Sequence, residues 1–487
     1  MGSKATEHQL GIVLMDSHSI MTFMCLQLLL LGVSATGSAG SNTSKIITAL
    51  PGYSGKLPFK LETGYIGVGD NEEVQLFYSF VESQRSPLRD PLLFWIPPGP
   101  GCSGFKALLY ETGPLKFRIG NYNGSLPTLE DNPWAWTQGL NIIYMDAPVG
   151  TGFSYSQSSE GYIMDDYKHV QQSYEFIQKW LNLHPQFLEN QLYVGGDSYS
   201  GTPIPMIVQK IVNDNEAGVV PMINLKGYVL GNPVTDSFTD SNSKIPYAHR
   251  LALISDQLYQ SAKESCNGNF VHVNSSNYQC SSDIDAIDEL LRDVNDVHIL
   301  EPVCSNAIPK PNADMESVRR YLSENSNPAF WCRSYNHMLS VIWANNKGVQ
   351  QALGVRNGTK TSWQGCNTTL AYTEDVTSVV GYHRNLTNAD LRLLIYSGDH
   401  DMSIPNIGTQ EWIKSLGLST DESWRVWSLD GQTAGYTEKL ISDSFTLTFV
   451  TVKGAGHLAA EYKVKECAAM IDSCIMSVQR PSMLSSI

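Results

Sequence analysis

Ser198 lies in a segment whose residue types could build a serine nucleophile. The segment reads QLYVGGDSYSG over residues 191–201. Its apolar first half predicts a short buried strand, a glycine-flanked turn follows, and residues 202–212 predict a helix. A strand, a tight turn and a helix in this order hold a serine hydroxyl above a sheet edge, as in a nucleophile elbow. Ser200 replaces the last glycine of a strict G-x-S-x-G pattern, but its side chain is still small. The turn alone does not exclude an ordinary strand–helix junction.

Two further apolar strands are each followed by a residue that could complete a triad. Residues 391–397 (LRLLIYS) precede Asp399 and Asp401, and residues 445–452 (FTLTFVTV) precede His457. Loops beyond the carboxyl ends of strands build the sites of open α/β sheets. A serine hydroxyl needs a base to take its proton and a carboxylate to orient that base. The chain order serine, acid, histidine is that of the α/β-hydrolases.

Two aspartates compete for the role of the acid. Asp399 directly follows Gly398, which is the pattern of a turn former that satisfies local backbone donors. Asp401 lies further into the loop. We therefore favour Asp401 as the residue that orients His457.

Seven longer motifs make the chain similar to a known family. They are LPGYSGKLPFKLETGYIGVG, FWIPPGPGCSG, YETGPL, DAPVGTGFSYS, GGDSYSG, YSGDHDMSIP and GAGHLAAEYK. With these motifs the chain resembles the plant serine carboxypeptidase-like proteins from about Leu50 to Cys474. The resemblance implies an α/β-hydrolase fold with a mostly parallel central sheet, flanking helices and an inserted helical cap subdomain. The site residues that it implies are the triad Ser198, Asp401 and His457, the oxyanion-hole N–H groups of Gly99 and Tyr199, and the substrate-binding residues Trp95, Glu111 and Asp197.

Two chemistries occur in the family that the chain resembles. Its peptidases hold a substrate carboxylate with an Asn in W-x-N-G-G-P-G-C and with a Glu directly before the nucleophile. Pro97 stands at the position of that Asn, and proline has neither an N–H nor a polar side chain. Asp197 stands at the position of that Glu and is one methylene shorter. Pro98 also replaces the first glycine of the pair, while Gly99 is retained.

We therefore expect transfer of an acyl group from a 1-O-glucose ester to a small-molecule acceptor through an acyl-Ser198 intermediate. A serine carboxypeptidase that releases C-terminal residues from peptides is the alternative. A secreted glycoprotein with an altered, inactive site is a third possibility. We expect no metal and no other cofactor, because the sequence has no phosphate-binding glycine loop and no histidine pattern with metal-ligand spacing.

Charge and the N-terminus restrict partners and location. The net charge of −15 argues against nucleic acid and anionic membranes as partners. Residues 20–33 form an apolar run of signal-peptide length that is too short for a comfortable bilayer span. Cleavage after Ala35 or Ala39 would follow. We expect a signal and leader at residues 1–39, a secretory route to the vacuole or the cell exterior, and no stable membrane anchor.

The cysteines and glycosylation motifs fit that route. Cys25 lies in the expected signal, which leaves eight of the nine cysteines, and secretory transit permits disulfides. By resemblance we pair Cys102 with Cys366, Cys266 with Cys280, and Cys304 with Cys332, and expect Cys467 and Cys474 to be unpaired. The N-x-S/T motifs are at Asn42, Asn123, Asn274, Asn357, Asn367 and Asn385.

The strand pattern divides the chain into a catalytic domain with an insertion. Residues 45–235 carry the oxyanion loop and the elbow, and residues 346–480 carry the acid and base loops. Residues 236–345 form the expected cap, because the strand pattern fades there and polar helices and four cysteines take over. The acidic segment 283–303 is either a linker excised on maturation or an amphipathic helix.

Overall fold

A twelve-stranded mixed sheet organises the part of the chain that the computed structural model describes, residues 44–119, 124–303, 333–359 and 362–476. Its strands are β1 (Lys45–Ile47), β2 (Leu61–Val68), β3 (Val74–Val81), β4 (Leu92–Ile96), β7 (Asn141–Met145), β8 (Tyr155–Ser156), β10 (Leu192–Asp197), β11 (Leu225–Gly231), β13 (Arg392–Gly398), β14 (Ser419–Leu429), β15 (Gln432–Ser442) and β16 (Phe445–Val452). The strand order is β1-β2-β3-β7-β4-β10-β11-β13-β16-β15-β14, and β8 pairs with β3. Two small sheets pair β5 (Leu115–Phe117) with β6 (Leu129–Asp131) and β9 (Met164–Asp165) with β12 (Tyr372–Thr373).

The centre of the sheet is parallel, as predicted. The parallel part of the sheet consists of six strands in the order β7-β4-β10-β11-β13-β16. All other pairings in this sheet, including those of β7 with β3 and of β16 with β15, are antiparallel. Successive side chains of a strand point to opposite faces. In β4, Leu93 and Trp95 belong to one hydrophobic cluster, while Leu92, Phe94 and Ile96 belong to a second. A strand that is buried on both faces needs a continuous apolar run. Apolar runs of this kind predicted the strands that precede the triad residues.

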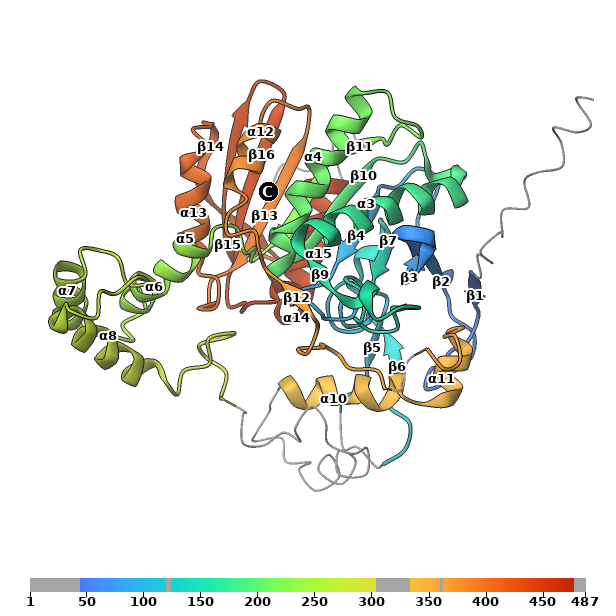
Figure 1. The fold of residues 1–487 in the computed structure, drawn as a ribbon, viewed down its shortest axis with the longest axis horizontal. Coiled ribbons are helices and arrows are strands. Elements are labelled where there is room, and N and C mark those ends of the chain that lie inside the picture. The colour runs from blue at the N-terminus through green and yellow to red at the C-terminus, as the bar shows by residue number, and fades with distance from the viewer. Residues whose placement is uncertain (1–43, 120–123, 304–332, 360–361, 477–487) are drawn as a thin grey trace, which may run out of the picture. The chain divides into compact units, whose positions relative to one another are not determined.

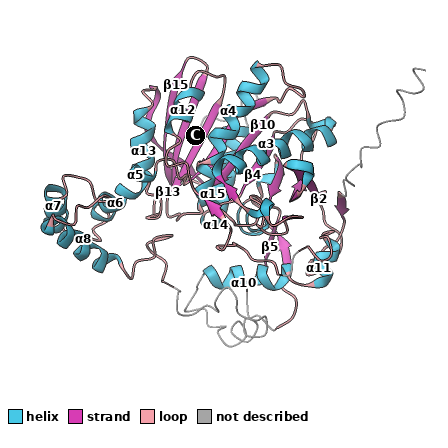
Figure 2. Cartoon of the chain, viewed as in Figure 1, coloured by secondary structure: helices cyan, strands magenta, loops and turns pink. Residues whose placement is uncertain are grey.

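Helices cover both faces of this sheet (Figures 1 and 2). One face packs against α3 (Asp166–Leu183), α4 (Pro203–Glu216), α12 (Val380–Leu386) and α13 (Asn406–Ser415). The other face packs against α10 (Arg333–Ala344), α11 (Lys347–Ala352), α14 (Ala459–Tyr462) and α15 (Val464–Ile471). The remaining helices of the described residues are α2 (Gly104–Lys106), α5 (Ser237–Asn242), α6 (Lys244–Arg250), α7 (Asp256–Ser265) and α8 (Tyr278–Leu291). The short 3₁₀ and π turns are η1 (Asp70–Glu72), η2 (Ala107–Glu111), η3 (Trp136–Gln138), η4 (Glu160–Tyr162), η5 (Pro185–Phe187), η6 (Ser198–Gly201) and η7 (Asp472–Met476).

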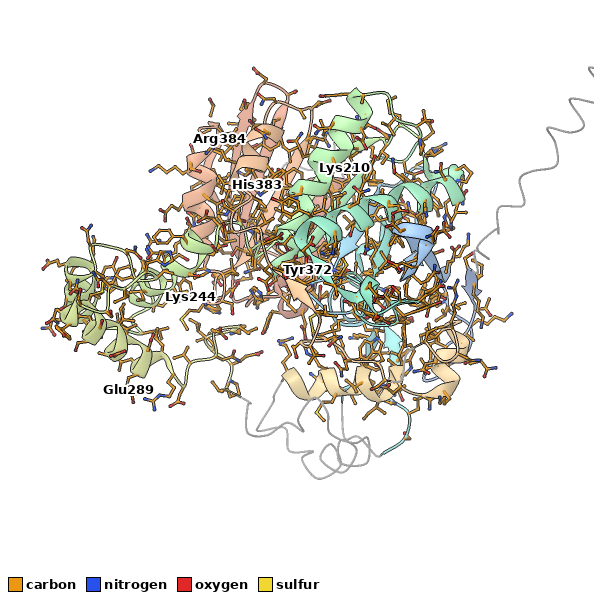
Figure 3. The ribbon with its side chains drawn as sticks, in the orientation of Figure 1. Lys210, Lys244, Glu289, Tyr372, His383 and Arg384 are labelled. Atoms are coloured by element: carbon orange, nitrogen blue, oxygen red, sulfur yellow. A yellow bond between two sulfur atoms is a disulfide. The ribbon has the colours of Figure 1, made fainter. Side chains whose placement is uncertain are left out.

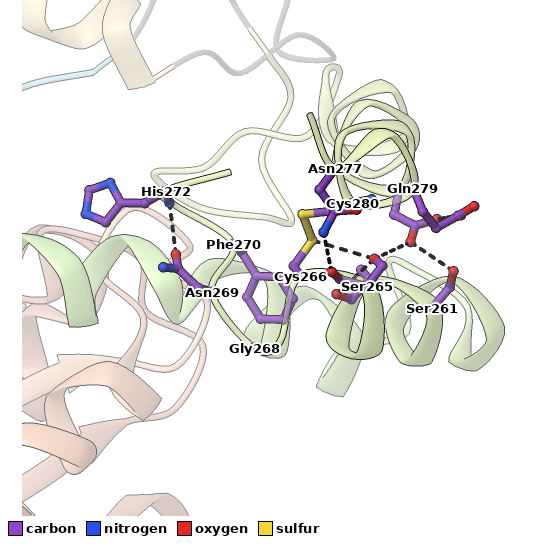
Figure 4. The surroundings of a disulfide bond; sticks show 12 residues. Ser261, Ser265, Cys266, Gly268, Asn269, Phe270, His272, Asn277, Gln279 and Cys280 are labelled. Carbon is purple, nitrogen blue, oxygen red and sulfur yellow. Dashed lines mark hydrogen bonds between the residues drawn. A yellow bond between two sulfur atoms is a disulfide. The ribbon is translucent and has the colours of Figure 1, made fainter. Parts of the chain in front are cut away.

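The region predicted to be a cap is helical where the structure describes it. Residues 236–303 contain α5 to α8 and no strand (Figure 2). A disulfide between Cys266 and Cys280 joins α7 to α8 (Figure 4). The first half of the acidic segment 283–303 belongs to α8, which agrees with the helix interpretation. The cap limits at 236 and 345 stay a prediction, since residues 304–332 lie outside the described part. No helix in that described part is long and apolar enough to cross a membrane.

Candidate active site

Ser198 occupies the turn between β10 and α4, and its neighbours explain the sharpness of that turn. Its φ is 58°, which places a non-glycine residue in the left-handed region. A Cβ at Gly196 would lie 2.1 Å from the Ile96 carbonyl oxygen, so only glycine fits there. The Ser200 hydroxyl donates to the Pro97 carbonyl at 2.7 Å. The serine that departs from the G-x-S-x-G pattern therefore links the elbow to the loop after β4.

The structure brings the three expected catalytic side chains together. His457 Nε2 lies 2.7 Å from Ser198 Oγ, and His457 Nδ1 lies 2.8 Å from Asp401 Oδ2. They come from the ends of β10, β13 and β16, which are parallel strands of one sheet. The arrangement suits general-base activation of the serine hydroxyl, with the carboxylate setting the imidazole tautomer.

Asp401, rather than Asp399, faces the histidine. Asp401 is fully buried, and its Oδ1 accepts hydrogen bonds from the Ser403 and Ile404 N–H groups at 2.8 and 3.2 Å. Asp399 Oδ1 instead accepts from the Gly454 N–H at 2.7 Å. Asp399 therefore joins the acid loop to the base loop, while Asp401 is the carboxylate that contacts His457.

The electrostatic surroundings of His457 favour its protonated form. Burial disfavours the imidazolium, but the charge and hydrogen bond of Asp401 outweigh burial and raise the pKa of His457 above its ordinary value. Asp197 and Asp296 add to this effect. A raised pKa fits a base that must stabilise the proton taken from the serine.

Two backbone N–H groups beside Ser198 suit an oxyanion hole. Gly99 borders the same cavity as Ser198, and its φ of 137° is accessible to glycine. Tyr199 lies in the first turn of η6, where N–H groups have no acceptor within the helix. Pro98 cannot donate, but its carbonyl accepts from the Cys102 N–H at 3.1 Å and shapes the loop.

Asp146 holds the oxyanion loop, and sequence reasoning missed it. Its Oδ1 accepts from the Ser103 hydroxyl at 2.6 Å and from the Gly104 N–H at 2.8 Å. Its Oδ2 accepts from the Phe153 N–H at 2.8 Å. The carboxylate is buried and follows β7 directly inside the motif DAPVGTGFSYS. An acidic residue at the end of a buried parallel strand was the available signal.

The Tyr199 side chain is anchored in a buried polar cluster. Its hydroxyl donates to Asp166 and contacts the Tyr372 hydroxyl. Tyr372 (Figure 3) also donates to Asp166 at 3.0 Å. The other Asp166 oxygen accepts from the Asp375 and Val376 N–H groups, both at 2.8 Å. The residue that carries one of the proposed oxyanion donors is thus fixed by its own side chain.

A cavity of about 560 Å³ opens beside the triad. Ser198, His457 and Gly99 border one part of it. Charged residues from α2, the segment after α8, α10 and α14 line the rest, namely Lys106, Arg292, Asp296, Glu301, Arg333, His337 and Glu461. These residues are far apart in sequence, so only the folded chain reveals them as one site.

The segment after α8 contacts both catalytic loops. The Asp296 carbonyl accepts from the Met402 and Ser403 N–H groups, each at 2.9 Å. The Val297 carbonyl accepts from the His457 N–H at 2.8 Å. Excision of residues 283–303 would remove these acceptors and part of the cavity wall.

A family model described as serine carboxypeptidase matches residues 51–477. The chain belongs to the serine carboxypeptidase family. Serine carboxypeptidase-like 17 of Arabidopsis thaliana is 45% identical over 433 residues, which cover 88% of this chain and 92% of that protein. Serine carboxypeptidase-like 13 of the same plant is 44% identical over 448 residues, which cover 92% and 97%. Membership of this family supports the prediction that the protein is a serine hydrolase-type enzyme.

A solved structure shows the same fold. It is the crystal structure of Kex1(delta)p, a prohormone-processing carboxypeptidase from Saccharomyces cerevisiae, with a TM-score of 0.67. The match covers 85% of this chain and 91% of that chain at 20% identity. Because the sequence identity is only 20%, this similarity shows a shared α/β-hydrolase fold and does not extend to activity.

In this serine carboxypeptidase family member, the three residues expected to bind substrate are buried and are not among the residues that line the cavity. Trp95 is fully buried and packs edge-to-face on Trp136. Asp197 and Glu111 are also buried, and Asp197 Oδ1 accepts from the Tyr396 hydroxyl at 2.6 Å. Burial raises the pKa of Asp197 to about 6, and burial together with the Asp197 charge raises the pKa of Glu111 well above its usual range. We infer a shared proton between the two carboxyl groups, because two ionised carboxylates cannot hydrogen-bond each other.

The expected covalent features fall in several places. The structure contains the disulfides Cys102–Cys366 and Cys266–Cys280, and Cys467 and Cys474 are free. Cys304, Cys332, Asn42, Asn123 and the apolar run 20–33 lie outside the described residues. The side chains of Asn274, Asn357 and Asn385 are exposed. Asn367 is partly buried, and its amide donates to the Gly150 carbonyl at 3.1 Å.

Proposed function

We propose that this protein is an acyltransferase that moves an acyl group from a 1-O-glucose ester to a small acceptor. Ser198 Oγ attacks the ester carbonyl while His457 takes its proton, and glucose leaves with that proton. The acceptor hydroxyl or amine then gives its proton to His457 and attacks the acyl-Ser198 carbonyl. The bond to Ser198 breaks, and Ser198 Oγ recovers the proton from His457. The N–H groups of Gly99 and Tyr199 stabilise the oxyanion in both halves.

The placement of Pro97, Glu111 and Asp197 carries the choice of transfer over peptide hydrolysis. Pro97 has no side-chain donor, and its carbonyl is occupied by Ser200. Glu111 and Asp197 are buried, and Asp197 Oδ1 accepts a hydrogen bond from the Tyr396 hydroxyl. Of the two groups that hold a peptide carboxylate in the peptidases, according to the resemblance, the Asn is replaced here by Pro97 and the Glu by the shorter, buried Asp197. A site that lacks these donors loses selectivity for such a group.

We propose a secretory route as well. Its support is the apolar run at residues 20–33, the disulfides and the exposed N-x-S/T sites. The vacuole and the cell exterior are both compatible with it.

The purified protein should be labelled at Ser198 by a fluorophosphonate. It should also form a new ester or amide when incubated with 1-O-glucose esters and a mixed pool of alcohols and amines. A blocked dipeptide is incubated in parallel, with Ser198→Ala as the control for both reactions. Free amino acid from the dipeptide, without any transfer product, would identify a carboxypeptidase. No labelling at all would identify an inactive glycoprotein.

A further inference from the structure

A second cavity, of about 400 Å³, lies at the other end of the strands that carry the triad. It is bordered by residues near the beginning of those strands, such as Tyr193 of β10 and Arg392 of β13. Ser198 and Asp401 instead follow the carboxyl ends of the same two strands. Residues 473–475 of η7 form another wall of the cavity. The volume is within the range of sites that bind small molecules.

Two hydrogen-bond donors meet at this cavity. Tyr193 and Arg392 are both in register with Gly227 of β11, which has no side chain to separate them. The Tyr193 hydroxyl is buried and has no hydrogen-bond acceptor among the described residues. Burial raises the pKa of Tyr193, and the nearby charge of Arg392 opposes that rise. Because a buried donor without an acceptor costs stability, a ligand oxygen at this position would be favourable.

Arg392 is also the cavity cation whose charge no carboxylate balances. Arg425 Nε lies 3.0 Å from a Glu422 oxygen. Lys439 Nζ lies 2.7 Å from an Asp421 oxygen. Within the described part of the chain, no carboxylate lies at ion-pair distance from the exposed Arg392, and its charge acts on the neutral Tyr193 hydroxyl. The cavity therefore has a positive charge that an anionic ligand can balance.

The inner wall of the cavity is apolar. Leu394, Val450 and Met470 border it, and all three belong to the buried hydrophobic cluster on this face of the sheet. Burial of apolar ligand surface against such side chains is favourable. A ligand that fits the cavity therefore has an anionic group at one end and an apolar body at the other.

We propose that this cavity binds a small organic acid that has one carboxylate and an apolar body. The carboxylate pairs with the Arg392 guanidinium, whose planar donors match two carboxylate oxygens. One of these oxygens also accepts a hydrogen bond from the Tyr193 hydroxyl, and the apolar body packs on the inner wall. This inference does not depend on the proposed acyl transfer, because the cavity shares no lining residue with the cavity beside Ser198.

The test measures binding by calorimetry to protein whose Ser198 has been blocked with a fluorophosphonate, so that the catalytic site contributes little. Hexanoate and benzoate are compared with hexanamide and benzamide, which have similar shapes and no charge. The acids should bind at least about tenfold more tightly than the amides, as expected for a charge-assisted hydrogen bond. Inorganic phosphate, an anion without an apolar body, should bind more weakly than hexanoate.

Substitutions assign the binding to this cavity. Arg392→Met should weaken binding of the acids on the order of 10- to 100-fold and leave that of the amides unchanged. Arg392→Lys should retain part of the affinity, because an ammonium does not pair with both oxygens as a guanidinium does. Tyr193→Phe should weaken binding several-fold. Arg384→Met is the matched control, at an exposed arginine of α12 on the other face of the sheet (Figure 3), and should have no effect.

The unfolding temperature without ligand shows whether each variant is folded. Equal affinities for acids and amides, or an unchanged affinity for the acids in folded Arg392→Met, would overturn the inference. Absence of binding up to about 10 mM acid would overturn it as well. Tighter binding of phosphate than of hexanoate would overturn the choice of an organic acid. These outcomes are distinct from a failure of the proposed function, which labelling of Ser198 and acyl transfer test.

Discussion

Asn232 donates from Nδ2 to Asp401 Oδ2 at 2.7 Å, the same oxygen that lies 2.8 Å from His457 Nδ1. Asn232 is fully buried and has a φ of 39°, a region that asparagine tolerates better than most residues. Its Oδ1 accepts from the Gly398 N–H at 3.2 Å. Asn232 thus holds the acid loop at the end of β13 and donates a hydrogen bond to the carboxylate that faces His457.

Replacing Asn232 with Asp keeps the shape and the acceptor for Gly398 but exchanges a donor for a carboxyl group. At low pH the new carboxyl is protonated and can still donate to Asp401. As it ionises, two like charges face each other and the pKa of His457 rises further. We expect near wild-type labelling rates at the acidic end and a loss of about tenfold or more at neutral pH. The pH dependence of fluorophosphonate labelling measures this, and parallel profiles for both proteins would argue against the role of Asn232.

The raised pKa of His457 sets the acidic limit of activity. The neutral imidazole is the base, so the rate should fall as pH decreases through a midpoint above about 6.5, the ordinary histidine value. The effect on stability has the same origin. The stabilisation from the Asp401–His457 pair is fully present below the pKa of the unfolded chain and is lost as pH rises through the folded pKa. Rate profiles and thermal unfolding between pH 5 and pH 9 check both expectations.

Asp401→Asn should move that midpoint to lower pH and reduce kcat on the order of 10⁴-fold, because the imidazole loses its orienting carboxylate. Asp399→Asn is the matched control, because Asp399 accepts a hydrogen bond from the Gly454 N–H and not from His457. We expect this substitution to lower kcat less than about tenfold. Comparable losses of kcat in the two variants would mean that activity depends on the conformation of the acid loop and not on the charge of Asp401.

The Glu111–Asp197 pair should make folding less stable as pH rises. Both folded pKa values are raised, that of Asp197 to about 6, whereas the unfolded values are about 4. The folded state therefore binds more protons above pH 4, and stability falls from there through pH 6 and beyond. Glu111→Gln removes one charge and supplies a donor to Asp197. We expect a flatter stability profile and a higher stability than that of the wild type at pH 8.

Thermal unfolding at several pH values measures this change. Glu189→Gln, at an exposed glutamate, is the control and should leave the profile as it is. A wild-type stability that increases steadily from pH 4 to pH 8, with the same slope in Glu111→Gln, would contradict the shared proton.

The Tyr199–Asp166–Tyr372 cluster should affect catalysis by holding the Tyr199 N–H in place. Tyr372→Phe removes one donor to Asp166 and the contact with the Tyr199 hydroxyl, while both proposed oxyanion N–H groups remain. We expect a loss of about 1–2 kcal/mol in unfolding free energy and a fall in kcat of several-fold with little change in KM, the pattern of an interaction made in the transition state. Lower stability with unchanged kcat would assign the cluster a structural role alone.

The sequence by itself determined the three strands that precede the triad residues, the elbow, and the types and order of those residues. These features are local, because an apolar run reports burial of both faces of a strand and a glycine-flanked turn reports steric crowding. The motifs also identified the family, and the family model agrees over residues 51–477.

Only the tertiary structure decided which side chains meet. The positions of Asp399 and Asp401 in the loop favoured Asp401, but the hydrogen bonds with Gly454, Ser403 and Ile404 that set the direction of each carboxylate appear only in the folded chain. The burial of Glu111 and Asp197 close to each other has no local signature. Their partners lie scores to hundreds of residues away, so burial and charge balance there exist only once the chain has folded.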